Sequence, residues 1–408
     1  MHSFAIIYIL LALYVVILLF ADSKQKVIGN KEYAFISLSF FFLMFFHVFV
    51  DPYSVEDLYR YEDMYNDICN SSFSSALETN INIDYIWAII NKIASFVSHD
   101  FTFMLFLYNS ILLCTVFIIT NKYSPYIPVS ILMFVLLTYD QSLFVLRQYL
   151  ATAFVLMSIP FIINKKFIPY LALCIVACLC HKSSIIWMPL FFLCNIKNTK
   201  LYTGIIVVAI VIIGFICSNP LVLAVFFNDY YMNYLDGGNP NNITQKLIAL
   251  TYLLCYILFA GPHILDNGIN KLAFTMLLIY TAIFCFAPPV GIITRVLKYF
   301  ELSLLFVVPI TMSYINNKPI RVIYLLSILF LQGYLFIRGL NESWISDYRL
   351  QEISLTIFLL IFTMMLLLVM HIKKTNKAML YNNFRSSNVC SIQRRNYDTT
   401  KGNTLKRR

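Results

Sequence analysis

The sequence predicts an all-α fold, a polytopic bundle of about 11 to 14 transmembrane helices. Of the 408 residues, 60% are apolar and only 12% are charged, about half the charged share of a soluble domain. The mean hydropathy is +0.76, and apolar runs of about 20 residues recur along the chain. A soluble domain of this length could not cover so much apolar surface. These features exclude a soluble enzyme, a secreted disulfide scaffold and a nucleic-acid-binding protein, despite a net charge of +10.

The apolar runs define the expected elements, because a helix needs about 20 apolar residues to cross the hydrocarbon. The expected spans are residues 4–20, 33–50, 101–120, 127–143, 144–163, 167–181, 183–196, 201–218, 246–263, 272–288, 296–313, 321–338 and 352–371. The first run has no basic residues before it and no small-residue cleavage site after it. We therefore expect a spanning helix there and not a signal peptide.

Basic residues orient these spans, because loops that carry Lys and Arg face the cytoplasm. If the short lysine-bearing loops and the C-terminal segment lie on that side, it holds 21 of the 30 basic residues and only 4 of the 20 acidic ones. The charge is then +17 on the cytoplasmic side and −7 on the other. An odd number of spans with an external N-terminus and a cytoplasmic C-terminus satisfies this distribution.

Residues 1–372 form one predicted transmembrane domain, and residues 373–408 form a polar, basic cytoplasmic tail that we expect to be disordered. The predicted external segments are residues 51–100, 218–245 and 339–351. The first of these is acidic, and its apolar stretch 85–97 fits a surface or re-entrant helix.

Charged side chains within apolar spans are costly, so each is a candidate functional residue. The following residues fall at the external ends of their predicted helices: Arg147 and Gln148, His181 and Lys182, then Arg295, Lys298 and Glu301. The topology depends on the basic residues of the loops and not on these residues. Their common depth therefore predicts an outward-facing polar pocket near the lipid headgroups.

The chemistry of these residues fits a phosphorylated substrate. Arg147, Arg295 and Lys182 supply positive charge, and the arginine fork matches phosphate oxygens in bidentate geometry. His181 has an ordinary pKa near neutrality and is therefore a candidate general base. The external segments add side chains suited to sugars, namely Asp57, Tyr59, Tyr61, Asp63, Tyr230 and Tyr231. A phosphate-binding floor beneath a sugar-binding rim is what a lipid-linked glycan requires.

Structural roles for the same residues remain open. Lys182 and Lys298 lie near helix ends, where lysine side chains extend to the membrane interface without binding a ligand. Tyrosines at membrane boundaries commonly form an aromatic belt. His181, next to two serines, fits a helix cap equally well. For His47, within the second span, we expect a buried histidine whose hydrogen bonds are satisfied.

Four segments taken in series resemble the EpsG-like group of polysaccharide polymerases, which is similar to the O-antigen polymerases called Wzy. The segments are Glu56-Asp57-Leu58-Tyr59-Arg60-Tyr61, Leu146-Arg147-Gln148-Tyr149-Leu150-Ala151-Thr152-Ala153, Cys180-His181-Lys182-Ser183-Ser184 and Thr294-Arg295-Val296-Leu297-Lys298-Tyr299-Phe300. The resemblance covers roughly residues 30 to 350. In the first segment the chain departs from the family pattern of an Asp followed by aromatic residues.

This resemblance implies a glycosyltransferase at the outer face of the bacterial inner membrane, which joins repeat units carried on undecaprenyl pyrophosphate. Arg147 and Arg295 would bind the leaving pyrophosphate, and His181 would deprotonate or orient the acceptor hydroxyl. Asp57 or Asp63 would hold sugar hydroxyls. The other predicted substrate-binding residues are Gln148, Lys182, Ser183, Lys298, Tyr299, Tyr59, Tyr230 and Tyr231. We expect a partner protein that regulates chain length and, since no cofactor motif or dense acidic metal site is visible, a metal-independent reaction.

Two other functions use similar residues. A flippase for the same lipid-linked unit also needs a cationic cavity, but its polar residues should extend through the membrane and its two halves should be related. The polar residues here gather at one face, which favours the polymerase. A different membrane acyltransferase or glycosyltransferase acting on lipid-linked sugars would use the same site.

Overall fold

The computed structural model describes residues 30–78, 85–197, 201, 202, 204–206, 208, 212, 243–286, 291–342, 354–372 and 374. Several of the expected features lie outside these residues: the span 4–20, most of 201–218, Tyr230, Tyr231 and nearly all of the tail 373–408.

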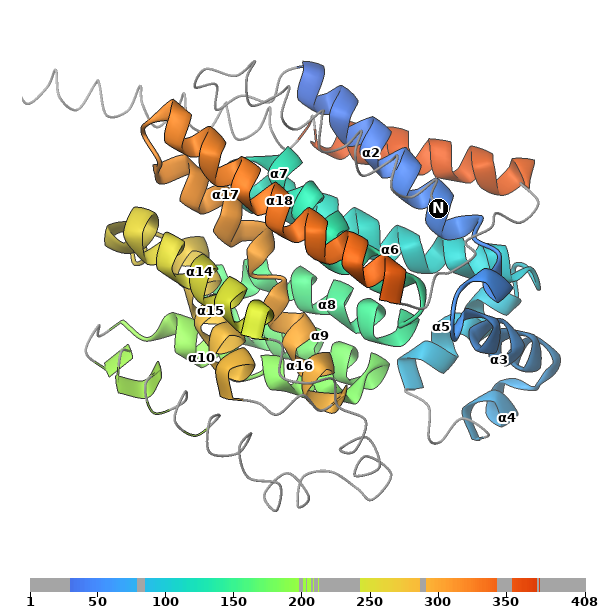
Figure 1. Cartoon of the computed structure of the whole chain (residues 1–408). Coiled ribbons are helices and arrows are strands. Elements are labelled where there is room, and N and C mark those ends of the chain that lie inside the picture. Colours follow the sequence, from blue (N-terminus) through green and yellow to red (C-terminus); the bar gives the residue numbers. More distant parts are fainter. Residues whose placement is uncertain are drawn as a thin grey trace, which may run out of the picture.

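The regular elements of the described residues are helices (Figure 1). In chain order they are α2 (Asn30–Val48), η1 (Pro52–Ser54), α3 (Leu58–Asn70), α4 (Phe73–Glu78), α5 (Tyr85–Ser95), α6 (Phe101–Tyr123), α7 (Ile127–Phe134), η2 (Val135–Tyr139), η3 (Gln141–Leu143), α8 (Leu146–Ile163), α9 (Phe167–Cys180), η4 (Lys182–Trp187), α10 (Leu190–Asn195), α14 (Ile243–Ala260), η5 (Gly261–His263), α15 (Gly268–Phe286), α16 (Gly291–Glu301), α17 (Leu304–Tyr314) and α18 (Lys318–Glu342). A further helix, Leu355–Ile372, follows.

Seven of the described helices are long and apolar enough to cross a membrane, and three shorter apolar helices accompany them. The prediction of an all-α transmembrane bundle is confirmed. The segment Arg295–Tyr314 is the most enclosed of the seven, with 83% of its most apolar 18 residues buried, whereas only 22% are buried in Leu355–Ile372. Peripheral helices expose apolar side chains such as Phe330 and Leu355, as expected for surfaces that face lipid acyl chains.

Helices that are adjacent in the sequence and helices that are distant in it pack together in the interior. Helix α8 packs against α6 and α9, α7 packs against α17, and α14 packs against α15 and α17. Helix α2 lies beside α6 and also beside the helix Leu355–Ile372, where the rings of Phe41 and Phe358 meet edge to face at 5.5 Å (Figure 1).

A layer of short helices, α3 to α5, covers one end of the bundle (Figure 1). In α3 the residues Leu58, Tyr61, Tyr65 and Ile68 are buried, the spacing of one helical face. Lys92 of α5 is buried and donates to the carbonyl oxygens of Ile68 at 2.9 Å and Ser71 at 2.6 Å. It thereby satisfies carbonyls at the end of α3. The stretch 85–97, predicted as a surface or re-entrant helix, is helical over Tyr85–Ser95 as α5.

Three predicted spans contain breaks. The span 127–143 ends in the π-helical η2 and the short η3, and the span 296–313 is interrupted at Leu302 and Ser303 between α16 and α17. The prediction of one continuous helix over 183–196 is wrong, because a 3-10 helix, η4, precedes α10 there. Pro189 separates the two and supplies no amide hydrogen for a continuing helix.

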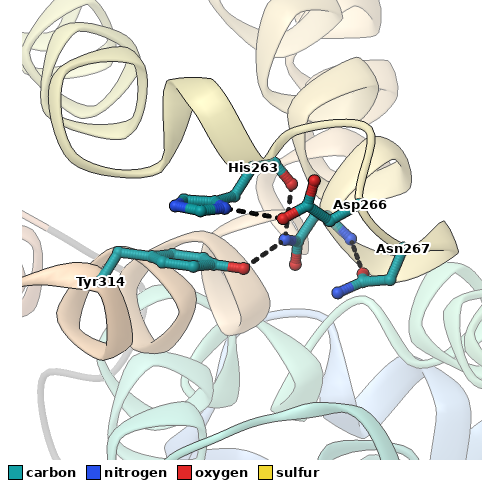
Figure 2. Close-up of polar contacts among 5 residues, drawn as sticks. His263, Asp266, Asn267 and Tyr314 are labelled. Atoms are coloured by element: carbon teal, nitrogen blue, oxygen red, sulfur yellow. Dashed lines mark hydrogen bonds and ion pairs between the residues drawn. The ribbon is translucent and has the colours of Figure 1, made fainter. Parts of the chain in front are cut away.

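The opposite end is closed by a polar cluster around His263 (Figure 2). The His263 ring stacks on Tyr314 with centroids 4.3 Å apart, and its Nδ1 contacts Asp266 Oδ2 at 2.7 Å. Asn270 donates to the His263 carbonyl oxygen at 2.9 Å and to the Tyr314 hydroxyl at 3.0 Å. These contacts join the α14–α15 connection to the C-terminal end of α17. That end of the segment Arg295–Tyr314 is the one remote from Arg295.

Candidate functional site

The sequence-predicted residues Arg147, His181 and Arg295 lie where three elements meet at the end of the bundle covered by α3 to α5. Arg147 is in the first turn of α8, His181 joins α9 to η4, and Arg295 is in the first half of α16. Helix α16 contacts both α8 and η4. The fold therefore brings together residues that are 34 and 114 positions apart in the chain.

A direct hydrogen bond joins two of these elements. The Gln148 side chain is buried and donates from Nε2 to the Arg295 carbonyl oxygen at 2.6 Å. Gln148 was predicted to contact substrate, whereas its amide group is engaged with the main chain of α16. This bond links the main chain of α16 at Arg295 to the turn of α8 that carries Arg147.

Both arginines act electrostatically on His181. Burial, then the positive charge of Arg295 and then that of Arg147, together lower the pKa of His181 to about 3. His181 lies in the turn after α9, outside the apolar helix Phe167–Cys180. The imidazole is consequently neutral at physiological pH, in contrast to the titration near neutrality expected from the sequence.

The turn that carries His181 is anchored from behind. Trp187 is fully buried, and its indole nitrogen donates to Ser158 Oγ of α8 at 3.0 Å. Tyr170 of α9 donates through its hydroxyl to the Trp187 carbonyl oxygen at 2.5 Å. Both bonds attach the C-terminal residue of η4 to helices that precede it, α8 and α9.

The predicted binding residues of this turn differ in exposure. Lys182 is exposed and Ser183 is half-buried. Ser183 donates to the hydroxyl of Tyr299 at 3.3 Å, and the Tyr299 ring is fully buried. Tyr299 is thus placed to support the turn from α16.

Lys298 forms an ion pair within α16. Its Nζ lies 2.7 Å from Glu301 Oε2, and the two side chains are 23% and 11% exposed. At this low exposure the pair is poorly screened by water, so the charge of Lys298 is largely committed to Glu301. Arg295, one turn earlier in the helix, is exposed.

The outer helices reach this site through Tyr61. The Arg147 guanidinium carbon lies 6.0 Å from the centroid of the Tyr61 ring, within the range of a cation–π interaction. Tyr61 is itself buried and meets Trp87 edge to face at 5.3 Å. The sequence placed Tyr61 among the side chains suited to sugars but gave no sign of its contact with Arg147.

The three other predicted residues of the first external segment lie in or beside α3. Asp57 has a left-handed backbone with φ of 60° and forms an exposed ion pair with Arg60 at 2.8 Å. Tyr59 is half-buried, its ring stacked 6.2 Å from that of Tyr53. Asp63 is exposed. Tyr230 and Tyr231, predicted on the second external segment, lie outside the described residues.

The predicted core role of His47 is confirmed. The ring is fully buried, with Nδ1 2.5 Å from Asn109 Oδ1 and Nε2 3.1 Å from the Tyr139 carbonyl oxygen. A residue near it, Asp140, was not singled out from the sequence, although it interrupts an apolar run as an intramembrane charge does. Asp140 is half-buried in the turn between η2 and η3, within electrostatic range of Lys298 and Glu301.

Comparison with known proteins gives one family. The family model described as "EpsG family" matches residues 33–350, which is more than half of the chain. No curated protein and no solved structure matches it.

Proposed function

Because the chain belongs to the EpsG family, a family of polysaccharide polymerase type, we propose that it polymerises lipid-linked oligosaccharide repeat units of a surface polysaccharide. In this proposal the growing glycan is transferred from undecaprenyl pyrophosphate to a hydroxyl of the next lipid-linked unit. The observation that carries the proposal is the convergence of Arg147 and Arg295, from different helices, on the neutral His181.

The two arginines are suited to the leaving group. When the bond between the anomeric carbon and the pyrophosphate oxygen breaks, negative charge grows on the pyrophosphate. Fixed guanidinium groups stabilise that growing charge, and each fork matches two phosphate oxygens. Arg295 is exposed and Arg147 is half-buried, so neither residue is fully enclosed by protein. The proposal therefore assigns both to the pyrophosphate.

His181 is assigned to orientation of the acceptor. A neutral imidazole accepts a hydrogen bond through one ring nitrogen and donates through the other. Its strongly lowered pKa makes it a weak proton acceptor, so orientation of the attacking hydroxyl suits it better than deprotonation. Ser183 and Lys182 would contact the substrate beside it.

The outer helices are assigned to the glycan. Asp57 and Asp63 have carboxylates that accept hydrogen bonds from sugar hydroxyls, and Tyr59 presents an aromatic face. Arg147 contacts Tyr61 of α3, so the sugar-binding and pyrophosphate-binding parts would be continuous. Tyr230 and Tyr231 are proposed to extend the same surface.

The location proposed for this reaction is the periplasmic side of the bacterial inner membrane, with the C-terminus in the cytoplasm. The support is the charge distribution of +17 and −7 between the two sides. A labelling experiment with single cysteines tests it. A cysteine at exposed Lys182 should react with an impermeant maleimide added to intact spheroplasts, whereas one at exposed Lys318 should react only after lysis.

Deletion of the gene in its native host tests the function. Loss of a polymerase should leave carrier molecules capped by a single repeat unit, while long chains disappear from a gel of surface polysaccharide. Loss of the single unit as well would instead identify a flippase. A plasmid copy of the wild-type gene should restore the long chains.

A further inference from the structure

The 3-10 helix η4 is fixed beside the candidate site by one of its rows of side chains. Residues three positions apart share a row in such a helix, and Ser184 and Trp187 are both fully buried. The centroid of the Trp187 ring lies 6.0 Å from that of Phe300 on α16, and its indole nitrogen donates to Ser158 of α8. The remaining side of η4 is therefore held in a constant direction relative to the two helices that carry the arginines.

That remaining side of η4 changes from polar to apolar along its length. It begins with Lys182, which is exposed, and Ser183, which is half-buried. Ile185 and Ile186 follow one turn later in the same two rows, and both are exposed. In the predicted topology the chain enters the membrane from its outer side here, so we expect the isoleucines to lie deeper than Lys182. A polar beginning followed by an apolar surface is the order of groups in a lipid phosphate.

Helix α9 brings a second apolar surface to the same turn. Ile168, Ile175 and Leu179 of this helix are exposed and recur at the spacing of one helical face. Leu179 comes 11 positions after Ile168, which corresponds to about 17 Å along the helix axis. Helix α9 packs against η4, and the two elements meet at His181. Exposed apolar side chains thus precede and follow the turn that carries His181.

The neighbouring charges distinguish this surface from the other apolar surfaces of the bundle. Helix α18 also exposes apolar side chains, such as Ile323, but its first turn carries Lys318 at the opposite end of the bundle. Here η4 contacts α16, and Ser183 donates to the Tyr299 hydroxyl at 3.3 Å. Tyr299 lies one turn after Arg295 in that helix. The apolar surface of η4 therefore begins where the proposed pyrophosphate site ends.

We propose that this surface binds the polyprenyl chain of the lipid carrier whose pyrophosphate lies on Arg147 and Arg295. The inference rests on the proposed polymerase function and assigns a further part of the same substrate. Lipid chains are as apolar as aliphatic side chains, so this contact adds little affinity by itself. Its effect is to place the pyrophosphate, and the anomeric carbon bonded to it, at a fixed depth beside His181. The residues of this tail surface are Ile168, Ile175, Leu179, Ile185 and Ile186.

Photo-crosslinking of purified full-length protein in lipid nanodiscs tests this assignment. Benzoylphenylalanine is introduced at position 185 or, as the matched control, at position 323, because Ile185 and Ile323 expose 59% and 62% of their surface. The probe is undecaprenyl pyrophosphate radiolabelled in its pyrophosphate group. Once the arginines hold the head, contact with the tail is intramolecular, so we expect position 185 to be labelled about tenfold more than position 323. Benzoylphenylalanine at position 179 should show the same preference.

Removal of the cations provides the second measurement. In a protein that carries both Arg147→Ala and Arg295→Ala, labelling at position 185 should fall to the level at position 323, because the pyrophosphate is no longer held. Equal labelling at the two positions with both arginines present would overturn the assignment, since bulk lipid would then be the occupant. A preference that survives loss of the arginines would also overturn it.

Chain extension by the wild-type protein, with a lipid-linked repeat unit as substrate, tests the polymerase function separately. Extension without preferential labelling at position 185 would overturn the tail surface alone. Preferential labelling without extension would overturn the polymerase function and leave a binding site for the carrier.

Discussion

Gln148 donates a 2.6 Å hydrogen bond to the main-chain carbonyl oxygen of Arg295, 147 residues away. Through this bond, α8 and α16 hold their two arginines in a fixed relation. Gln148, the residue after Arg147 on α8, therefore helps to position the main chain that carries Arg295 on α16.

Replacement of Gln148 by Leu should remove this bond at nearly constant volume. The Arg295 carbonyl oxygen would lose a buried donor, which we expect to cost about 1 to 3 kcal/mol of unfolding free energy. Displacement of Arg295 by as little as about 1 Å should lower the extension rate about 100-fold. Thermal unfolding in detergent and the rate of chain extension measure the two effects.

Gln332→Leu is the control for this variant. Gln332 is also buried and donates to the Tyr252 hydroxyl at 2.7 Å, on a helix that carries none of the proposed site residues. It should lose similar stability but retain chain extension. Equal loss of activity in both variants would argue against a positioning role for Gln148.

Replacement of either arginine should abolish long chains. Arg147→Ala and Arg295→Ala each remove a donor from the leaving pyrophosphate, a change that typically lowers the rate about 100- to 1,000-fold. Arg147→Lys should also retain little activity, because an ammonium group lacks the planar fork. The gel pattern of surface polysaccharide, read against protein level in the membrane, checks both expectations. Lys318→Ala, an exposed cation at the opposite end, should leave the long chains unchanged.

The fold was largely predictable from the sequence because apolar run length records the membrane thickness. Helices such as α6 and α15 need no other information. The interruptions were less predictable. Over 183–196 the apolar run continues through η4 and Pro189, so its hydropathy gives no sign of the break. The length of an apolar run indicates how much of the chain lies in the membrane. Where a helix stops within that run depends on local backbone hydrogen bonding.

The members of the candidate site were partly predictable for a related reason. Arg147, His181 and Arg295 stand out because charge is rare in apolar runs. Their environments depend on tertiary contacts and could not be inferred. The neutral state of His181 results from burial together with the charges of Arg295 and Arg147, which meet it only in the folded chain. Tyr61 was one of many tyrosines until the fold placed it against Arg147.

Acid should destabilise the protein partly through His181. The pKa of His181 is lowered from 6.5 to about 3 in the folded state by burial and by Arg295 and Arg147. Between these two values the unfolded state binds more protons than the folded state, so this contribution to stability is full above pH 6.5 and declines as the pH falls toward 3. His181→Gln should therefore lose less thermal stability than wild type between pH 7.5 and pH 5. His99→Gln, at an exposed position, should show the wild-type loss. A wild-type loss in His181→Gln would contradict the neutral state of His181.

The contact between Arg147 and Tyr61 predicts that an aromatic ring is needed at position 61. The guanidinium carbon lies 6.0 Å from the ring centroid, and such contacts contribute about 0.5 to 2 kcal/mol. Tyr61→Phe keeps the ring and should retain most of the activity. Tyr61→Leu removes it and should lower the extension rate about 2- to 30-fold, since 1.4 kcal/mol corresponds to a factor of ten.

Tyr65→Leu provides the comparison, because Tyr65 is a buried tyrosine on the same helix that donates instead to the Ser98 carbonyl oxygen at 2.6 Å. If Tyr65→Leu lowers the rate as much as Tyr61→Leu does at equal loss of stability, the effect arises from packing of α3. A larger decrease for Tyr61→Leu assigns it to the arginine, because the two changes remove the same ring from the same helix and differ in what that ring contacts.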